Sequence, residues 1–250
     1  MTELKITEED AEKLNSKFTM IVTPIARHPT RQFTASMMET TQNLIKAGLK
    51  FHIKGMAGCS DLAYTRNHLA SSFLESECTD MLWIDDDIGW ASQDVLRLLL
   101  SDKDFIGGAY RKKLQSLDVN DPMAWCIKLH DDRETVTDVD GSYEVKGIGM
   151  GFVKITRKVF QTIVDANPNA KRGWESTESE PKNFYSFFHF DGFGNGEDYS
   201  FCNLWQEYGG KVWVDPVINL IHCGDYEFFG NVGEMVKSQE GKVVNVKSAA

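Results

Sequence analysis

The chain contains 250 residues, of which 42% are hydrophobic and 26% are charged, so it is long enough to bury one sizeable core. Its formal net charge of −10 argues against an extended nucleic-acid-binding surface, because phosphate backbones require clustered positive charge. Five scattered cysteines without a C-x-x-C pair argue against a disulfide framework and against a structural zinc site.

The first 110 residues alternate between strand-like and helix-like segments. Strands are predicted where short apolar runs end at turn residues, and helices where apolar residues recur every three or four positions behind a capping residue. The predicted strands cover residues 18–25, 50–54, 80–87 and 104–110, and the predicted helices follow the caps Thr30, Ser60 or Asp61, and Ser92. This alternation predicts an α/β fold, with a mostly parallel sheet and helices on both faces.

The remainder of the chain has a different pattern. Residues 167–190 have no clear period and contain many aromatic side chains, which is typical of a functional loop. We expect antiparallel strands at 123–129 and 142–145, a core strand at 151–155, helices over 156–166 and 198–208, and short strands at 211–214 and 217–221. The predicted organisation is an N-terminal extension (1–17), a single domain (18–229, with halves 18–115 and 116–229) and a polar tail (230–250).

Membrane insertion and secretion are not expected from this sequence. No apolar run approaches the roughly 20 residues required to span a bilayer. Residues 1–10 are polar and acidic rather than signal-like. These features predict a soluble, cytoplasmic protein.

The most informative feature is the triplet Asp85-Asp86-Asp87, which ends an apolar strand. Three adjacent carboxylates repel one another, so without a counter-cation the pKa of at least one should rise. Ligands of open α/β sheets bind at the carboxyl ends of the strands, where a hard divalent cation would offset the repulsion. Alternation along the strand predicts that Asp85 and Asp87 project to one side and Asp86 to the other. A solvated acidic turn that caps the next helix is the alternative interpretation.

An apolar strand followed by D-x-D resembles the metal- and nucleotide-sugar-binding motif of the GT-A glycosyltransferases. The resemblance implies a GT-A fold, which is a Rossmann-like mixed sheet, and a nucleotide-sugar-binding role for residues 18–115. It implies that Asp87 ligates Mn²⁺ or Mg²⁺, which bridges the donor diphosphate. Asp85 is implied to contact the ribose or the metal and its water shell, and Asp86 belongs to the same nucleotide-sugar site.

Three further segments resemble donor-binding parts of the same family. The first predicted strand ends at Thr23, Pro24 and Ile25. The resemblance implies that these residues line the pocket for the base and the ribose. Arg66, followed by Asn67 on the helix before the triplet, resembles an arginine that approaches the diphosphate or the acidic motif. A planar, permanently charged guanidinium suits phosphate recognition. Gly108 lies in a Gly-rich turn that resembles the donor-sugar side, with tight strand packing as the alternative.

Residues 116–229 are implied to bind the acceptor. Gly196-Glu197-Asp198 precedes a predicted helix and resembles a G-E-D motif in which the Asp, sometimes the Glu, takes the proton of the acceptor. Such a base must lie within hydrogen-bond reach of the attacking hydroxyl, although helix capping alone also favours acids at this position. His222 ends a later short strand and resembles a further metal ligand. A mixed carboxylate and imidazole site suits Mn²⁺ better than Ca²⁺.

The resemblance covers roughly residues 18–224 and implies a metal-dependent glycosyltransferase, either a hexosyl- or a pentosyltransferase. It would move a sugar from a nucleotide diphosphate sugar to an acceptor hydroxyl, with inversion and with Asp198 as the base. The compact form resembles soluble viral, phage or bacterial members, and a viral member would act in the host cytoplasm.

Several alternatives remain open. The acceptor could be a glycan, a protein, a small molecule or a modified nucleobase, and Arg111-Lys112-Lys113 is a candidate contact for an anionic one. A nucleotide-sugar-binding module without turnover is one rival function, and a glycoside hydrolase with paired carboxylates is another. A nucleotidyltransferase is the third rival, but residues 23–32 lack the glycine-rich loop that such enzymes usually carry after the first strand.

Overall fold

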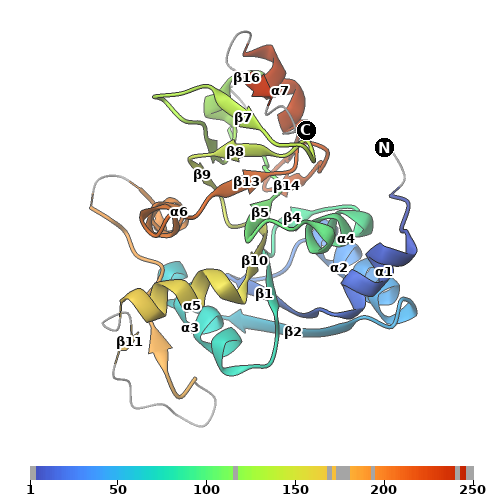
Figure 1. Ribbon diagram of the computed structural model, residues 1–250, viewed down its shortest axis with the longest axis vertical. Helices are drawn as coiled ribbons and strands as arrows, with labels where there is room; N and C mark the ends of the chain where they lie inside the picture. Colours follow the sequence, from blue (N-terminus) through green and yellow to red (C-terminus); the bar gives the residue numbers. More distant parts are fainter. Residues whose placement is uncertain are drawn as a thin grey trace.

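The fold is organised around a nine-stranded mixed sheet with helices on both faces (Figure 1). A computed structural model describes residues 4–114, 118–167, 171–172, 181–192, 195–239 and 243–245. In sheet order the strands are β16 (Val243–Asn245), β7 (Thr135–Thr137), β8 (Tyr143–Val145), β13 (Val212–Val214), β5 (Phe105–Gly107), β10 (Phe152–Thr156), β3 (Asp80–Ile84), β1 (Phe18–Ile25) and β2 (Lys50–Ala57).

Helices and smaller ribbons surround this sheet. The helices are α1 (Glu8–Asn15), α2 (Arg31–Lys46), α3 (Leu62–Glu75), α4 (Ser92–Leu100), α5 (Arg157–Ala166), α6 (Glu197–Glu207) and α7 (Val232–Ser238), with a 3₁₀ turn η1 (Pro122–Ala124). The smaller pairings join β6 (Ile127–Lys128) to β9 (Gly147–Ile148), β11 (Lys171–Arg172) to β12 (Phe184–Tyr185), and β14 (Ile221–Cys223) to both β4 (Ile88–Gly89) and β15 (Glu227–Phe229).

The direction of the strands confirms the expected mixed, mostly parallel sheet. Strands β2, β1 and β3 pair in parallel, and β13 is parallel to β5. Strand β10 lies antiparallel between β3 and β5, and β8 lies antiparallel between β13 and β7. Within the described part of the sheet, only β10 and β8 oppose the other strands.

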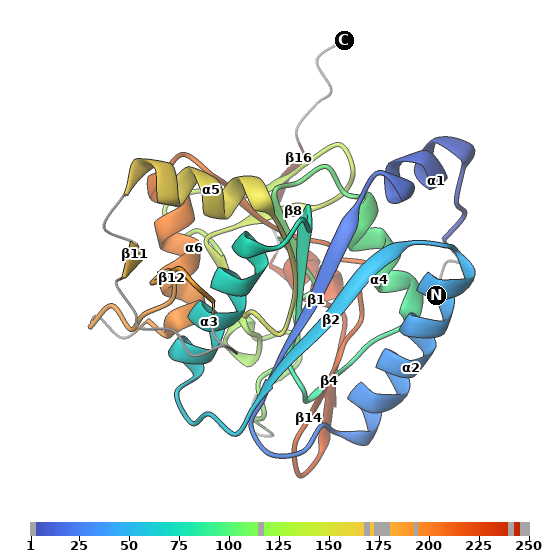
Figure 2. The ribbon, with the colours of Figure 1, turned by 90° about the horizontal axis from the view of Figure 1, so that it is seen from below.

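Alternation along the central strands assigns their side chains to two cores. Met81 and Trp83 of β3 face the core beneath α3, α5 and α6, whereas Leu82 and Ile84 face the core beneath α2 and α4. Figure 2 shows these two groups of helices on opposite sides of the sheet. All residues of β3 are buried, which explains why the strand is apolar along most of its length. The three aspartates that follow it lie beyond the carboxyl end of the strand.

Most predicted elements of the first half are confirmed. The strand predicted at 217–221 is wrong, because β14 begins only at Ile221, and two further details differ. Thr30 and Asp61 cap α2 and α3 through side-chain hydrogen bonds. Ser92 is the first residue of α4 rather than its cap, which is Ala91. The predicted pairing of 123–129 with 142–145 is wrong, because β6 pairs with β9 while β8 pairs with β7 and β13. All five cysteines are unpaired.

The polar tail predicted at 230–250 is wrong for residues 232–238, which form α7. Its cap Asn231 accepts a hydrogen bond from the N–H of Glu234. Val232, Met235 and Val236 are fully buried in the core that also holds α6. Three apolar residues at helical spacing are thus enough to dock a segment of otherwise polar composition. No helix in the described ranges is both long and apolar enough to cross a membrane.

A buried acid at the start of α4 should make the stability of the protein depend on pH. Asp94 is 4% exposed, and burial raises its pKa to about 6, although the Ala91 N–H and Arg97 oppose the rise. The aspartate of an unfolded chain has a pKa near 4. Between about pH 4 and 6 the folded protein therefore keeps a proton on Asp94 that the unfolded chain has released. As the pH rises through this range, the free energy of unfolding falls by up to about 3 kcal/mol. Asp94→Asn, which keeps an oxygen for the Ala91 N–H, should remove this loss.

Urea denaturation of wild type and Asp94→Asn at pH 4.5 and pH 7 measures the effect. We expect the variant to gain stability relative to wild type as the pH rises. A difference between the two proteins that is the same at both pH values would contradict this interpretation of Asp94.

Candidate functional site

The triplet Asp85-Asp86-Asp87 forms a turn between β3 and β4. The N–H of Ile88 donates to the carbonyl oxygen of Asp85 (3.2 Å) and closes the turn. Asp85 faces α3, Asp86 faces the loop that follows β1, and Asp87 faces β14. The predicted two-sided alternation is therefore wrong, because the strand ends at Ile84 and a turn sends the three carboxylates in three directions.

Asp87 and His222 form a carboxylate–imidazole pair. Asp87 Oδ2 lies 3.5 Å from His222 Nε2, and His222 Nδ1 lies 2.6 Å from the carbonyl oxygen of Arg111. Because a carbonyl oxygen only accepts, Nδ1 carries a hydrogen. Nε2 therefore faces Asp87, as a donor in the imidazolium form or as a lone pair in the neutral form. Two ligands about 2.1 Å from one cation and about 90–110° apart lie roughly 3.0–3.4 Å from each other, so this pair fits one divalent cation.

Lys113 also contacts the carboxylate of Asp87. Its Nζ lies 2.5 Å from Asp87 Oδ2, the same oxygen that faces the imidazole. Burial raises the pKa of Asp87, but hydrogen bonds from His222 and Lys113 together with their charges outweigh burial and lower the pKa below its usual range. Asp87 is therefore ionised at neutral pH, as a metal ligand must be.

Arg66 joins the triplet to α6. Its side chain is 3% exposed, with Nη2 3.4 Å from Asp85 Oδ2 and Nε 3.0 Å from Glu197 Oε1. The guanidinium lies over the ring of Trp83, 4.8 Å from the centroid, and the indole N–H donates to Asp85 (3.3 Å). The remaining nitrogen, Nη1, is buried without a partner among the described residues. One guanidinium thus holds an acid of the turn after β3 and an acid of α6 together at the carboxyl end of β3.

The two acids at the start of α6 have different surroundings. Glu197 is paired with Arg66, whereas Asp198 forms no ion pair with any described residue. Burial raises the pKa of Asp198, Glu197 adds to the rise, and Arg66 opposes it. A carboxylate without a counter-ion and with a raised pKa is the better proton acceptor, so the geometry favours Asp198 over Glu197 as a base.

A cleft of about 420 Å³ lies between the end of β1 and the triplet. Asp86 accepts a hydrogen bond from the N–H of Ala26 (3.1 Å), which ties the loop after β1 to the triplet. Thr23 is buried, and its hydroxyl has no partner among the described residues. The residues that line the cleft include Pro24, Ile25, Arg27, Cys59, Ser60, Thr65 and the three aspartates. The structure therefore brings Pro24, Ile25 and Asp86 to one cleft.

Packing accounts for Gly108. A Cβ at this position would lie 2.5 Å from Ile218 Cγ2 and 3.0 Å from Leu220 Cδ1. Any larger residue would therefore force these two side chains apart. A contact between Gly108 and the donor sugar remains a prediction.

Asn67 of α3 binds the backbone of Phe187 and Phe188, which belong to the aromatic-rich segment predicted as a functional loop. Its side-chain oxygen accepts from the N–H groups of Phe187 (2.7 Å) and Phe188 (2.8 Å), and its amide donates to the carbonyl of Phe188 (2.8 Å). Phe187 and Phe188 are fully buried, and Phe188 packs against Trp83 with ring centroids 5.7 Å apart. These phenylalanines are core residues rather than part of a functional loop. Residues 168–170 and 173–180 of the predicted loop lie outside the described residues.

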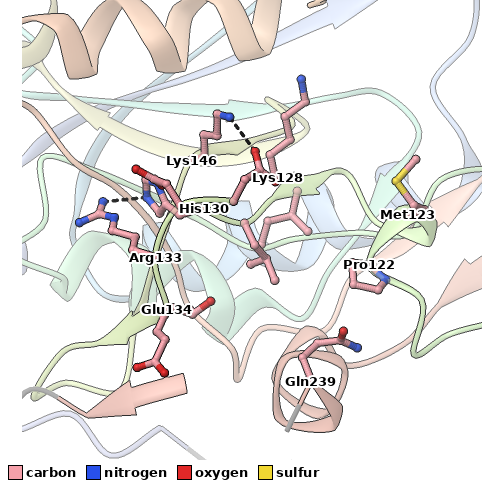
Figure 3. A pocket seen from close by; sticks show the side chains of 13 residues that line it. Pro122, Met123, Lys128, His130, Arg133, Glu134, Lys146 and Gln239 are labelled. Atoms are coloured by element: carbon pink, nitrogen blue, oxygen red, sulfur yellow. Dashed lines mark hydrogen bonds and ion pairs between the residues drawn. The ribbon is translucent and has the colours of Figure 1, made fainter. Parts of the chain in front are cut away.

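A second cavity, of about 780 Å³, lies beside β6 (Figure 3). Lys128 borders it, but its ammonium donates to Asn195 Oδ1 (2.5 Å) and lies 4.2 Å from the ring centroid of Tyr199 on α6. Lys128 therefore reaches α6 from the border of the cavity, which Ile127 and Leu129 also line. The lining of this cavity does not include Asp85, Asp86, Asp87, Asp198 or His222, and we assign it no part in the candidate site.

As ligands of a divalent cation, Asp87 and His222 would fill only part of its coordination shell. Among the described residues, no group of three or more His, Cys, Asp or Glu side chains is placed to hold a metal ion. Asp87 and His222 supply two ligands, whereas Asp85 faces Arg66 and Trp83. Two protein ligands suffice where substrate phosphate oxygens and water complete the coordination, as in many Mg²⁺ sites. Direct ligation by Asp85 remains a prediction.

Comparison with known proteins gives a likeness of fold. No protein-family model matches the sequence, and no curated protein matches it. Similar solved structures include a mutant of Drosophila β-1,4-galactosyltransferase 7 with manganese, UDP-Gal and xylobiose (14% identity, 93% of this chain, 77% of that chain, TM-score 0.39). Another is GalNAc-T7 with UDP, GalNAc and Mn²⁺ (14% identity, 82% of this chain, 43% of that chain, TM-score 0.41). A third is the inositol-1-phosphate CTP transferase of T. maritima (11% identity, 91% of this chain, 98% of that chain, TM-score 0.36).

Three contacts of the site were not predicted from the sequence. They are the indole of Trp83 beneath Arg66, the ammonium of Lys113 on Asp87, and the carbonyl of Arg111 on His222. Trp83 precedes Asp85 by two positions on an apolar strand, so alternation could have placed it beside that carboxylate. The other two contacts join segments far apart in the chain and leave no local sequence signal.

Proposed function

We propose that this chain is a metal-dependent glycosyltransferase of GT-A architecture, which transfers a hexose or pentose from a nucleotide diphosphate sugar to an acceptor hydroxyl. The observation that supports it most is the buried bridge formed by Arg66, which brings the strand-end triplet and the Gly-Glu-Asp helix to one place. Residues 18–115 would bind the donor and residues 116–229 the acceptor, within one domain whose core also includes α7.

The donor would lie across the cleft at the end of β1. Pro24 and Ile25, which line the cleft, would contact the base and ribose together with the neighbouring Thr23, and the diphosphate would lie against the triplet. Asp87 and His222 would hold Mn²⁺ or Mg²⁺, which supplies Lewis acidity to the leaving diphosphate when bound. Burial raises the pKa of Asp85 and Arg66 opposes the rise, so Arg66 would favour the ionised form of this carboxylate and orient it.

Asp198 would act as the base of the transfer. Its carboxylate takes the proton of the acceptor hydroxyl, the oxygen forms a bond to the anomeric carbon, and the bond from that carbon to the diphosphate breaks. Attack from the face opposite the leaving group inverts the anomeric centre. Glu197 is committed to Arg66 and would position α6 rather than accept the proton.

A donor panel tests this proposal. UDP-, GDP- and other nucleotide sugars are incubated with the protein and Mn²⁺, and released nucleoside diphosphate is measured, with EDTA and Asp87→Ala as controls. We expect release that depends on one donor, on metal and on Asp87. Pyrophosphate release from a nucleoside triphosphate and a sugar phosphate would instead indicate a nucleotidyltransferase. Stabilisation against heat by a nucleotide sugar without release would indicate a binding module, and neither effect with any donor would contradict the proposal.

A further inference from the structure

Residues 111–113 contact the proposed metal site in two different ways. The backbone carbonyl of Arg111 orients the imidazole of His222, and the side chain of Lys113 lies on Asp87. The backbone at Arg111 is itself paired with Trp125 through an antiparallel bridge, and the N–H of Lys112 donates to the carbonyl of Ala124 (2.7 Å). The orientation of the imidazole therefore depends on a fixed backbone, whereas the contact with Asp87 depends on a flexible side chain.

The ammonium of Lys113 contacts the carboxylate oxygen that would ligate a cation held by Asp87 and His222. Its Nζ is 2.5 Å from Asp87 Oδ2, the oxygen that lies 3.5 Å from His222 Nε2. Two cations cannot share the space beside one carboxylate oxygen without strong repulsion. Metal binding at this pair therefore requires the ammonium to move.

The surroundings of Lys113 allow that movement. Its side chain is 38% exposed, so the ammonium can return to water without crossing the core. Its stem passes Gly224, where a Cβ would lie 3.0 Å from Lys113 Cδ. Its contact with Asp87 places the ammonium at the last carboxylate of the triplet.

We propose that Lys113 is the resident counter-ion of Asp87 and that an incoming divalent cation displaces it, so that this lysine sets the metal affinity of the donor-free protein. The inference rests on the proposed metal site of Asp87 and His222. While Lys113 is in place, the carboxylate is neutralised without metal. When metal binds, the ammonium is freed at the rim of the triplet, where a diphosphate would lie.

Direct titration with Mn²⁺ tests the inference without any sugar donor. Free Mn²⁺ is measured by electron paramagnetic resonance in the presence of wild type, Lys113→Met, Lys113→Arg and the matched control Lys112→Met. Methionine keeps most of the stem and removes the charge. We expect Lys113→Met to lower the Kd for Mn²⁺ about three- to fivefold, the value of a partly exposed ion pair, and Lys113→Arg to retain the wild-type Kd. Lys112→Met removes the same charge one residue away and should change the Kd by less than about twofold, because it ends no contact with Asp87.

The outcomes separate this inference from the proposed function. If Mn²⁺ binding depends on Asp87 but Lys113→Met leaves the Kd unchanged or raises it, only the counter-ion role is overturned. If Asp87→Ala binds Mn²⁺ as wild type does, the metal site itself is wrong. Binding gained only in Lys113→Met supports the inference, whereas no binding in either protein overturns both. Melting temperatures of all variants confirm that each is folded.

Discussion

Asp198→Asn should reduce nucleoside diphosphate release about 10²- to 10⁴-fold, the usual contribution of a general base. The amide has the shape of the carboxylate but does not take the proton of the attacking hydroxyl. Burial and Glu197 both disfavour the ionised Asp198, so the neutral variant should melt at a higher temperature than wild type. The kcat for release and the melting temperature, measured on the same preparations, show whether the two move in opposite directions.

The matched control is the neighbouring acid. Glu197→Gln ends the charge pair with Arg66, so it should lower the melting temperature. Binding of Mn²⁺ and donor by Asp198→Asn should stay within about twofold of wild type, because the base acts on the acceptor. Unchanged release in Asp198→Asn would remove this residue from the mechanism.

The pH dependence of kcat/KM tests the role of the Asp198 carboxylate independently. Burial, with Glu197, raises the pKa of Asp198, and a base must be deprotonated to act. The acidic limb of kcat/KM should therefore lie above the pH range in which an ordinary aspartate titrates, with activity rising as the pH rises through it. The residual activity of Asp198→Asn should lack this limb. A limb that persists in the variant would assign the titration to another group.

Arg66→Met should destabilise the protein by about 3–5 kcal/mol, since it leaves the half-buried Asp85 and the buried Glu197 without their shared partner. Urea denaturation measures the loss. Arg31→Met is the matched control: Arg31 lies 3.7 Å from Glu227, but its side chain is 87% exposed, so no measurable change is expected. The double variant Arg66→Met with Glu197→Gln should recover part of the stability, because one of the two stranded charges is gone.

A loss from Arg66→Met no larger than that from Arg31→Met would contradict the bridge. The same variant should also lose donor turnover, because α6 carries Asp198 and is held to the triplet through Glu197. Recovery of stability in the double variant without recovery of turnover would separate the structural contribution of Arg66 from its positioning of the site.

Elements with a strong local signal could be predicted from the sequence. Strand β1 matches its predicted bounds, and α2 and α3 begin behind the predicted caps Thr30 and Asp61. Their patterns depend only on residues within a few positions, so packing elsewhere did not override them. The position of β10 between β3 and β5 was not predictable in this way, because pairing partners are chosen by three-dimensional packing rather than by local pattern.

The residues of the candidate site could be predicted from the sequence, whereas the directions of their side chains could not. The acids, the arginine and the histidine were selected by motif and by their places at strand and helix ends. Their directions were not, because the turn at the triplet replaces strand alternation and sends Asp85 to Arg66 rather than to Asp87. Helix α7 was missed since only three apolar residues mark it within a polar segment.

Anomalous diffraction from a crystal grown with Mn²⁺ and the donor selected by the panel tests the central claim most directly. The account predicts one manganese peak about 2.0–2.3 Å from a carboxylate oxygen of Asp87 and from His222 Nε2. It also predicts diphosphate oxygens on the same ion, with Lys113 displaced and the sugar directed toward Asp198. A manganese ion bound elsewhere, or a donor bound away from the triplet, would contradict the account.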